Sequence, residues 1–355
     1  MSLARLAVSD IFVPVEIDEN NIYSGIRKVL ETIKPIWSQE KINFKLFTDG
    51  ITNKLVACYL SDEITEGVDI VLVRIYGNKT DLLIDRTAEI RNITTLNGHG
   101  LAPKIFGVFK NGLVYEYYPG VTLNVDIVRD LKVVAMVAQH MAKMHKVELG
   151  KEITKEPMLW DKIEQFLCLI PESFANEEKQ IRFASSFGSV TRLRIEFERL
   201  KSKLTKSESP IVFAHNDLLL GNVIYNESKG MVSFIDFEYA AYNYQAYDIA
   251  NHFNEYVGLS VYDIDYNRYP DKEFQMYWIR LYLSEYLCQE SPGDAEVEKV
   301  YVEVQQLSLA SHFLWGIWSL VQYELSDIDF DFATYAEIRL NRYFDQKDKI
   351  FKECI

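Results

Sequence analysis

Two short polar segments in the second half of the chain carry side chains that could do chemistry together. The first segment follows an apolar run and contains Asp217, two residues after His215, and Asn222, five residues after Asp217. Fourteen residues after Asn222, a second apolar run delivers Asp236. Phosphoryl transfer needs a carboxylate beside the acceptor hydroxyl, and it needs Mg²⁺, which takes oxygen ligands. The spacing therefore predicts Asp217 as a general base and Asn222 and Asp236 as magnesium ligands.

A positive charge for the phosphates is expected from the first half of the chain. Arg74 lies in the middle of an apolar, strand-like run, where a charge needs a partner. Glu89, fifteen residues later in a helix-like segment, is the candidate partner, and an arginine can hold phosphate oxygens with two N–H groups. The alternative is an edge-strand arginine that faces solvent. Thr52 and Asn53, in the loop of the first hairpin, could lie over the phosphates, although many hairpin loops carry such residues.

The elements before residue 118 predict how these residues are positioned. Alternation and turn signals predict strands and a helix in the order β-β-β-α-β-β, after a first helix. An antiparallel sheet with one inserted helix is the small lobe of the protein-kinase architecture, and the absence of GxxxxGK[ST] and GxGxxG excludes P-loop and Rossmann proteins. The predicted helices are 20–34 and 81–96, and the predicted strands are 44–47, 54–60, 70–76, 104–109 and 112–117.

After Pro119 the pattern becomes mainly helical. We expect two lobes, a nucleotide-binding lobe of residues 1–118 and a catalytic lobe of residues 119–355. The predicted fold is α+β and protein-kinase-like, with a small antiparallel-sheet N-lobe that has one helix and a larger, mainly helical C-lobe. The expected elements after Pro119 are a helix at 131–147, two helices within 158–205, strands at 211–214 and 231–235, and helices from 272 onward.

Composition limits the class of protein. The 355 residues include 38 basic and 52 acidic side chains, a formal net charge of −14, which disfavours nucleic acid or an anionic membrane as the main partner. Four cysteines without a CxxC spacing predict neither a disulfide framework nor a zinc site and fit a reducing compartment. Neither a signal peptide within 1–20 nor a membrane span at 309–323 is predicted. We therefore expect a soluble, cytoplasmic protein.

Five segments of the chain carry a family resemblance, namely 71–77, 215–225, 234–239, 243–255 and 310–318. In these segments the chain closely resembles the choline/ethanolamine kinase family, and the similarity runs from about residue 24 to 345. The resemblance implies ATP- and Mg²⁺-dependent phosphorylation of an amino alcohol, which is the first step of the cytidine-diphosphate route to phospholipids. It implies ATP and the amino alcohol as partners and leaves the oligomeric state open, a homodimer included.

The same resemblance implies roles for individual residues. Asp217 is then the base, and Asn222 and Asp236 hold magnesium. Arg74 contacts the nucleotide phosphates, and Glu89 orients Arg74. The residues that match the amino-alcohol pocket of the family are Tyr239, Glu255, Trp315, Trp318, Phe330 and Tyr335.

Two features of such a pocket also follow from the residues themselves. Trp315 and Trp318 are three residues apart and share one face of a predicted helix. They could form an aromatic wall for an ammonium group, because cations bind well over tryptophan faces; the alternative is a stripe that faces the core. Asp248 and Glu255 are seven residues apart on a helix-like stretch and would suit a small cation, whereas the alternative is a solvated acidic face.

Ethanolamine, rather than choline, is the predicted acceptor. Choline kinases usually carry Gln two positions after the catalytic Asp, often followed by Glu, whereas Leu219 and Leu220 stand here, as is typical of ethanolamine kinases. Gly221 departs from that branch, which often has Lys at this position. The predicted product is phosphoethanolamine, on the CDP-ethanolamine route to phosphatidylethanolamine. The alternatives are a choline or dual kinase, another small-molecule phosphotransferase such as an aminoglycoside kinase, and a catalytically inactive kinase-like scaffold.

Overall fold

The computed structural model describes residues 11–47, 53–61, 69–77, 82–326 and 328–353. The chain forms two compact units, which we call unit 1 and unit 2. Unit 1 comprises the residues up to Val121 together with 226–228 and 233–238, and unit 2 comprises the remainder. The sequence prediction assigned all of 119–355 to the second lobe. Residues 119–121, 226–228 and 233–238 belong to unit 1 instead. In the last of these segments, the carboxylates of Asp236 and Glu238 form ion pairs with Arg74.

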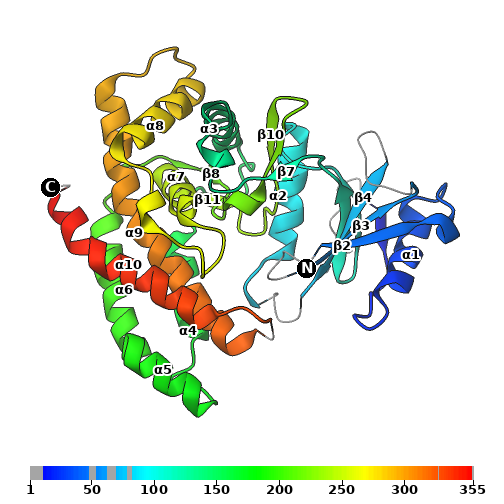
Figure 1. The fold of residues 1–355 in the computed structure, drawn as a ribbon, viewed down its shortest axis with the longest axis horizontal. Helices are drawn as coiled ribbons and strands as arrows, with labels where there is room; N and C mark the ends of the chain where they lie inside the picture. Colours follow the sequence, from blue (N-terminus) through cyan, green and yellow to red (C-terminus); the bar gives the residue numbers. More distant parts are fainter. Residues whose placement is uncertain (1–10, 48–52, 62–68, 78–81, 327, 354–355) are drawn as a thin grey trace. The chain divides into compact units, whose positions relative to one another are not determined.

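Unit 1 is built on a six-stranded sheet with the strand order β1-β5-β6-β4-β3-β2. Figure 1 labels three of its neighbouring strands, β2, β3 and β4. Neighbouring strands are antiparallel, except that β1 is parallel to β5. Strand β4 lies between β3 and β6, so Arg74 stands opposite Leu55 and Leu113 in the interior of the sheet. The strands are β1 (Ile11–Val13), β2 (Asn43–Phe47), β3 (Asn53–Tyr59), β4 (Ile70–Tyr76), β5 (Ile105–Phe109) and β6 (Gly112–Glu116).

Two helices complete unit 1. The apolar face of α1 (Ile22–Ile33) packs with residues of β3 and β4 in the core. Helix α2 (Arg86–Gly98) begins after Asp85, whose carboxylate accepts hydrogen bonds from two backbone N–H groups of the first turn at 3.0 Å. This cap fixes where α2 starts and therefore where Glu89, in its first turn, is presented.

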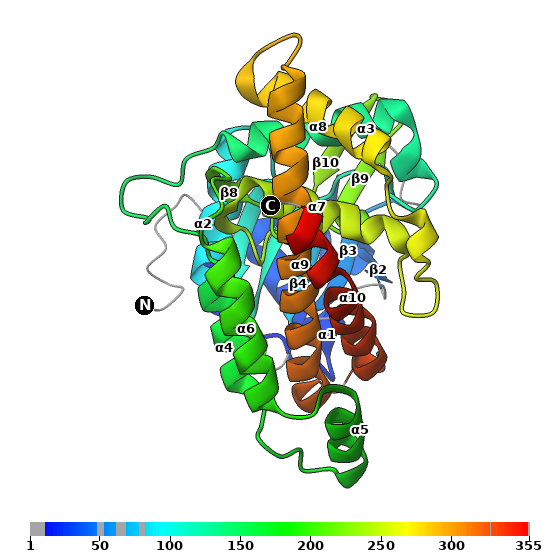
Figure 2. The ribbon, with the colours of Figure 1, turned by 90° about the vertical axis from the view of Figure 1, so that its left-hand side faces the viewer.

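Unit 2 is mainly helical and is organised around α9, a helix of 32 residues. Helices α4, α7, α8 and α10 pack against α9, and Figure 2 shows α6 and α10 on opposite sides of it. Neither α9 nor any other helix in the described part of the chain has the length and apolar character needed to cross a membrane. The helices are α3 (Leu131–His145), α4 (Leu159–Leu169), α5 (Glu177–Phe187), α6 (Val190–Leu204), α7 (Gln245–Asn254), α8 (Lys272–Leu287), α9 (Asp294–Leu325) and α10 (Phe332–Glu353).

Short strands hold the polar segments that the sequence singled out. Strands β8 (Ile211–Ala214) and β11 (Ala241–Tyr244) form an antiparallel pair in unit 2. The first polar segment, 215–222, follows directly after β8 and therefore starts from a fixed strand end. The second polar segment follows β10. The remaining strands are β7 (Val121–Thr122), β9 (Val223–Asn226) and β10 (Met231–Phe234).

Most predicted elements are present, but the sequence missed several short strands and one helix. Strands β1 and β11 have three and four residues, too few for a period to be recognised. The stretch 158–205 holds three helices instead of two, because Gly188, with a left-handed φ of 82°, ends α5 and Ser189 caps α6. Helices α1 and α2 of unit 1 correspond to the two helices predicted at 20–34 and 81–96, of which the second is the one inserted in the sheet.

Candidate active site

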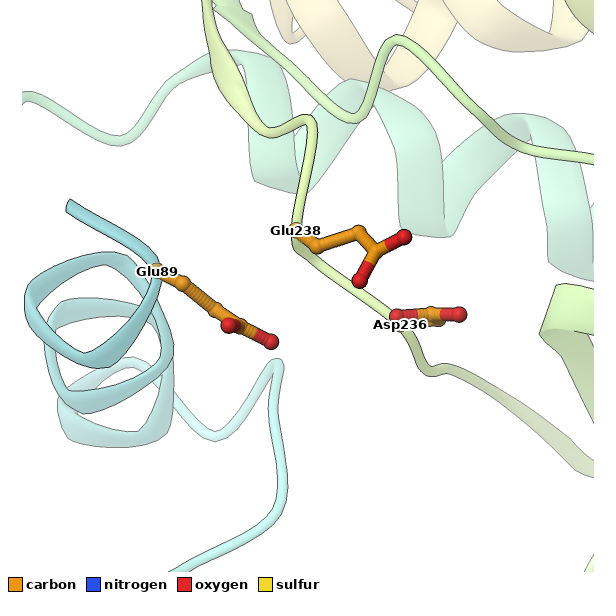
Figure 3. A group of neighbouring side chains, drawn as sticks. All are labelled: Glu89, Asp236 and Glu238. Atoms are coloured by element: carbon orange, nitrogen blue, oxygen red, sulfur yellow. The ribbon is translucent and has the colours of Figure 1, made fainter. Parts of the chain in front are cut away.

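Arg74 lies at the centre of a buried group of charged side chains in unit 1. From β4, its Nη1 atom is 2.8 Å from Glu89 Oε1 on α2 and 2.8 Å from Asp236 Oδ1. The guanidinium also forms an ion pair with Glu238. Figure 3 shows the carboxylates of Glu89, Asp236 and Glu238 gathered at one place. The predicted pair of Arg74 and Glu89 is present, and Arg74 also binds the segment that carries Asp236.

Arg86 completes this charged group. Its Nη1 atom is 2.9 Å from Glu89 Oε2 and 3.1 Å from Glu238 Oε2, and its guanidinium carbon lies 4.0 Å from the centre of the Tyr76 ring. Burial by itself would lower the pKa of Arg74 and of Arg86, but the neighbouring carboxylates raise the pKa of both. Both guanidiniums are therefore charged. Three carboxylates face two guanidiniums, so the group carries a formal negative charge in excess.

One carboxylate of this group, that of Asp236, is available to a divalent cation. Oxygen atoms of Glu89, Asp236 and Glu238 lie within 4.8 Å of one another. Asp236 is the most accessible, with 33% of its side chain exposed against 0% for Glu89 and 4% for Glu238. Its Oδ1 atom lies near Arg74 without hydrogen-bond geometry, so it keeps lone pairs for another partner. Hard divalent cations prefer oxygen ligands, so Asp236 fits one, whereas Glu89 and Glu238 are already paired with the two guanidiniums.

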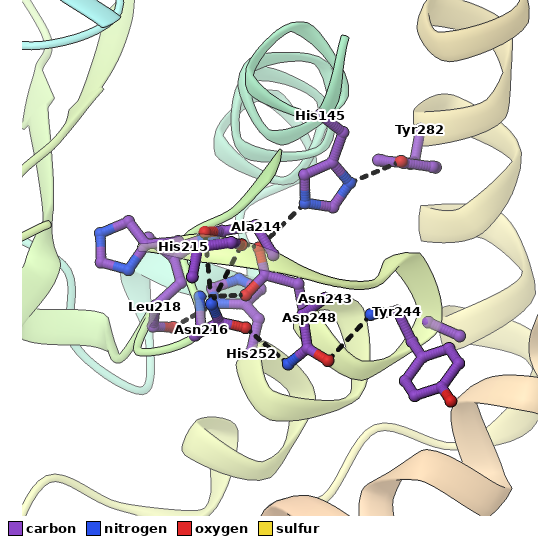
Figure 4. Close-up of polar contacts among 12 residues, drawn as sticks. His145, Ala214, His215, Asn216, Leu218, Asn243, Tyr244, Asp248, His252 and Tyr282 are labelled. Atoms are coloured by element: carbon purple, nitrogen blue, oxygen red, sulfur yellow. Dashed lines mark hydrogen bonds and ion pairs between the residues drawn. The ribbon is translucent and has the colours of Figure 1, made fainter. Parts of the chain in front are cut away.

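Asp248 on α7 holds the start of the loop that carries Asp217. Its Oδ2 and Oδ1 atoms accept hydrogen bonds from the backbone N–H groups of His215 and Asn216, at 2.9 and 2.7 Å (Figure 4). His145 Nε2 lies 2.9 Å from Asp248 Oδ2, and His145 Nδ1 lies 2.6 Å from the Tyr282 hydroxyl. Burial would raise the pKa of Asp248, but the hydrogen bond to His145 and the neighbouring groups hold it below its usual range.

This environment changes the interpretation of Asp248. The sequence placed it in the amino-alcohol pocket, but its side chain is fully buried and both oxygens are bound inside the protein. It therefore supports the loop and does not offer a carboxylate to a small cation. The spacing of Asp248 and Glu255 could not reveal this. Every residue of α7 is buried, so a helix face that the two residues share can be directed to the interior of the protein as well as to a ligand.

Asn216 anchors the same loop from within. Its backbone is left-handed, with a φ of 67°, a conformation that asparagine tolerates better than most residues. Its Nδ2 group donates to the carbonyl of Tyr239 at 2.9 Å, and its Oδ1 atom accepts from Asn243 Nδ2 at 2.7 Å. The loop is therefore tied to the segment that leads into β11.

The residues around Asp217 are held as well. His252 Nδ1 lies 2.9 Å from the carbonyl oxygen of Leu218, and Asn222 Nδ2 donates to the carbonyl of Asp217 at 2.8 Å. That bond identifies the other end of the Asn222 amide as its acceptor oxygen, which suits the cation-binding role predicted for it. Asp217 is thus presented by a loop whose backbone is hydrogen-bonded before and after it.

An aromatic wall is formed by Tyr239 and two residues of α9. The ring centres of Tyr239 and Trp315 are 5.2 Å apart, those of Trp315 and Trp318 are 5.6 Å apart, and both pairs are nearly perpendicular. Trp318 Nε1 donates to the Tyr239 hydroxyl at 2.9 Å, and Trp315 Nε1 donates to Asn251 Oδ1 at 2.8 Å. Both indole N–H groups are bound within the protein and the rings are largely buried, so any contact of these rings with a ligand is through their π surfaces.

The ring cluster continues to the remaining aromatic residues predicted for the pocket. Phe332 lies 5.8 Å from Trp318 and 4.8 Å from Phe330, measured between ring centres. Phe330 in turn lies 5.9 Å from Tyr335. The structure therefore brings all five predicted aromatic residues into one continuous cluster in unit 2.

Glu255 adds a carboxylate to this cluster. Its Oε1 atom is 2.8 Å from Nη1 of Arg339, which also donates to the Tyr335 hydroxyl at 3.1 Å. Burial raises the pKa of Tyr335, although the positive charge of Arg339 opposes this rise. Asn216, next to Asp217, donates to the carbonyl of Tyr239, whose ring belongs to the cluster. Unit 2 combines aromatic rings, a carboxylate and the predicted base in one region.

Some candidate residues fall outside this description, and others were missed. Thr52 lies outside the described residues, and Asn53 is the first residue of β3, where no side chain is described. Glu238 was missed, although its spacing of two from Asp236 across the buried Phe237 is a recognisable alternation. Arg339 was missed as well, although it follows Tyr335 by one helical turn on α10.

Comparison with solved structures identifies the fold. The structure of an ethanolamine kinase from Plasmodium vivax matches with a TM-score of 0.80 and 29% identity, over 92% of this chain and 89% of that chain. The predicted α+β, protein-kinase-like fold is confirmed by this match. The fold and the arrangement of carboxylates and arginines define a kinase-like phosphotransferase.

Comparison of sequences identifies the family. The family model described as choline/ethanolamine kinase matches residues 44–344. An ethanolamine kinase of Drosophila melanogaster is 43% identical over 95% of this chain and 79% of its own length, and ethanolamine kinase 1 of Mus musculus is 43% identical over 94% and 92%. The chain belongs to the choline/ethanolamine kinase family, as the sequence resemblance indicated.

Proposed function

We propose that this chain transfers the γ-phosphoryl group of ATP to the hydroxyl of ethanolamine. The product is phosphoethanolamine, and the reaction is the first step of the CDP-ethanolamine route to phosphatidylethanolamine. The relatives that are 43% identical over nearly the whole chain are ethanolamine kinases, which favours the ethanolamine branch that the sequence predicted. The observation that carries the proposal is the hydrogen bond of Asn216, next to Asp217, to the carbonyl of Tyr239, whose ring belongs to the aromatic cluster with Trp315 and Trp318.

In the proposed reaction, Asp217 is the general base. Its carboxylate takes the proton from the acceptor hydroxyl while the acceptor oxygen bonds to the γ-phosphorus, the bond from that phosphorus to the β-phosphate bridge breaks, and ADP leaves. The loop around Asp217 is held through Asp248, Asn216 and Asn222, so little reorganisation is needed to place the base. The ammonium of the acceptor is held by Glu255 and by the aromatic cluster.

The charged group of unit 1 supports a nucleotide role. Arg74 contacts the phosphates of ATP, and Glu89 and Glu238 orient its guanidinium. A kinase of this family that acts with ATP uses a divalent metal, and we propose Mg²⁺, held by Asn222 and Asp236. When bound, the ion neutralises charge on the phosphates. Thr52 and Asn53 stay predictions as nucleotide contacts.

Location and assembly are further parts of the proposal. We place the protein in the cytoplasm, because Cys58, Cys168 and Cys288 are free thiols and two of them are exposed, as is usual in a reducing compartment. A homodimer remains a prediction. Neither point enters the chemistry described above.

Choline is the second candidate acceptor. The rings of Tyr239, Trp315 and Trp318 can hold a trimethylammonium group as well as a primary ammonium, so we expect choline to be phosphorylated too. Choline should be the slower substrate, because a trimethylammonium group has no N–H donors for Glu255. The test of the proposed function is ³¹P NMR of a reaction with ATP, Mg²⁺ and ethanolamine. A new phosphomonoester signal that matches phosphoethanolamine is expected. ATP that stays intact in the presence of ethanolamine, with the protein folded, would contradict the proposal.

A further inference from the structure

Arg339 on α10 is a buried cation beside a pocket that is proposed to bind a cation. Only 3% of the residue is exposed. Its Nη1 group donates to Glu255 Oε1 at 2.8 Å and to the Tyr335 hydroxyl at 3.1 Å, and its Nη2 group donates to Ser311 Oγ at 3.0 Å. A single planar guanidinium thus fixes three groups from different parts of unit 2. Burial would lower the pKa of Arg339, but Glu255 and the neighbouring tyrosines raise it, so the charge is permanent.

A permanent positive charge at this place weakens the attraction of Glu255 for another cation, since the ion pair is neutral as a whole. Glu255 must then act on a ligand mainly through the direction of its free lone pairs. Its Oε2 atom accepts no hydrogen bond within the described part of the chain, and 17% of its side chain is exposed. The Tyr335 oxygen accepts one bond from Arg339 and keeps a second lone pair. Arg339 therefore presents two oriented acceptors.

The aromatic wall does not depend on Arg339 in the same way. Trp315 Nε1 is bound directly to Asn251, and Trp318 Nε1 is bound directly to the Tyr239 hydroxyl. Both bonds survive if the guanidinium is removed. Arg339 thus binds the hydrogen-bond acceptors directly, whereas it reaches the indole contacts only indirectly, through Ser311, whose Oγ accepts from Arg339 and donates to Asn251 Oδ1.

We propose that Arg339 is a positioning residue that determines acceptor specificity, by orienting Glu255 and Tyr335 toward the N–H groups of a primary ammonium. This inference rests on the proposed function. A primary ammonium has three N–H donors and profits from oriented acceptors, whereas a trimethylammonium has none and depends on ring contacts and charge. Arg339 therefore favours ethanolamine and its monomethyl derivative over choline. It touches neither reacting group and acts through its two neighbours.

The test is Arg339→Lys, which keeps the charge but loses the planar fork that reaches all three partners. Initial rates are measured with ethanolamine, N-methylethanolamine and choline at saturating ATP. The KM for ethanolamine should rise about tenfold, as expected for one lost charge-assisted hydrogen bond, while the KM for choline changes less than about threefold. The KM for ATP should stay the same. Arg342→Lys is the matched control, because Arg342 lies on the same helix and its guanidinium carbon is 4.3 Å from the centre of the Tyr266 ring. This control should leave the KM values for ethanolamine, choline and ATP unchanged.

The outcomes separate this inference from the proposed function. If the wild-type protein phosphorylates neither ethanolamine nor choline, the proposed function fails. If the wild type is active and Arg339→Lys raises the KM of both acceptors by the same factor, or leaves both unchanged, the specificity role is overturned. Should Arg339→Lys fold poorly, Tyr335→Phe keeps the ring but removes the hydroxyl that accepts from Arg339, and it should raise the KM for ethanolamine about threefold without a matching rise for choline. Equal shifts in that variant also overturn the inference.

Discussion

Asp248→Asn is the substitution whose effect the structure defines most closely. The change preserves shape but replaces one carboxylate oxygen with an NH₂ group, which can only donate hydrogen bonds. Both oxygens of Asp248 accept from backbone N–H groups, those of His215 and Asn216. Either orientation of the new amide therefore sets its NH₂ against one of these donors and leaves a buried N–H group without an acceptor.

The expected magnitudes follow from these contacts. An unpaired buried donor costs roughly 1–3 kcal/mol and the lost charge-assisted bonds add to this, so the free energy of unfolding should fall by about 3 kcal/mol. The loop that presents Asp217 should shift, and a displacement of about 1 Å at a reacting group lowers the rate by about 10²-fold. We expect kcat to fall by about that factor, with little change in the KM for ATP.

Urea unfolding and initial rates measure both effects. Asp345→Asn, at an exposed position of α10, is the control and should change the free energy of unfolding by less than about 0.5 kcal/mol. The pKa of Asp248 is lowered in the folded protein, so its charge stabilises the fold above the ordinary aspartate value of about 3.9. That stabilisation is lost as the pH falls through the lowered folded-state pKa, and the difference between wild type and variant should shrink there. A variant with wild-type stability and kcat at pH 7 would refute the reasoning.

Two further predictions concern the reacting groups. Asp236→Asn removes a carboxylate from the proposed cation site, so turnover should fall by ~10²-fold or more while the protein stays folded; near wild-type turnover in a folded variant would exclude this role. Asp217→Ala should abolish most turnover and leave ATP binding, measured by calorimetry, largely intact; loss of ATP affinity with surviving turnover would mean that Asp217 is not the base.

Several parts of this molecule could be predicted because they depend on local patterns. The strand with Arg74 and the helix with Glu89 were predicted from their periods, and the ion pair between them is present at 2.8 Å. The spacing of Trp315 and Trp318 predicted a shared helix face, and their rings are in contact. Each of these inferences needs only the geometry of one helix or of two elements close in sequence.

The parts that could not be predicted depend on long-range packing. Arg339 meets Glu255 across 84 residues of sequence, and His145 meets Asp248 across 103. No local period contains such information, because the partners are brought together only when α3, α7 and α10 pack. Asp248 was assigned to the pocket for this reason, although its carboxylate is directed to the loop backbone.

The central claim is that this protein phosphorylates an amino alcohol and prefers ethanolamine. The most direct measurement is a coupled ADP-release assay that gives kcat/KM for ethanolamine and choline side by side, at subsaturating acceptor and saturating ATP and Mg²⁺. An acceptor that donates hydrogen bonds to the oxygens of Glu255 and Tyr335 should have a kcat/KM about tenfold or more above that of an acceptor that leaves these oxygens unpaired. The value of kcat/KM should therefore be higher for ethanolamine than for choline. Equal values, or a higher value for choline, would contradict the account.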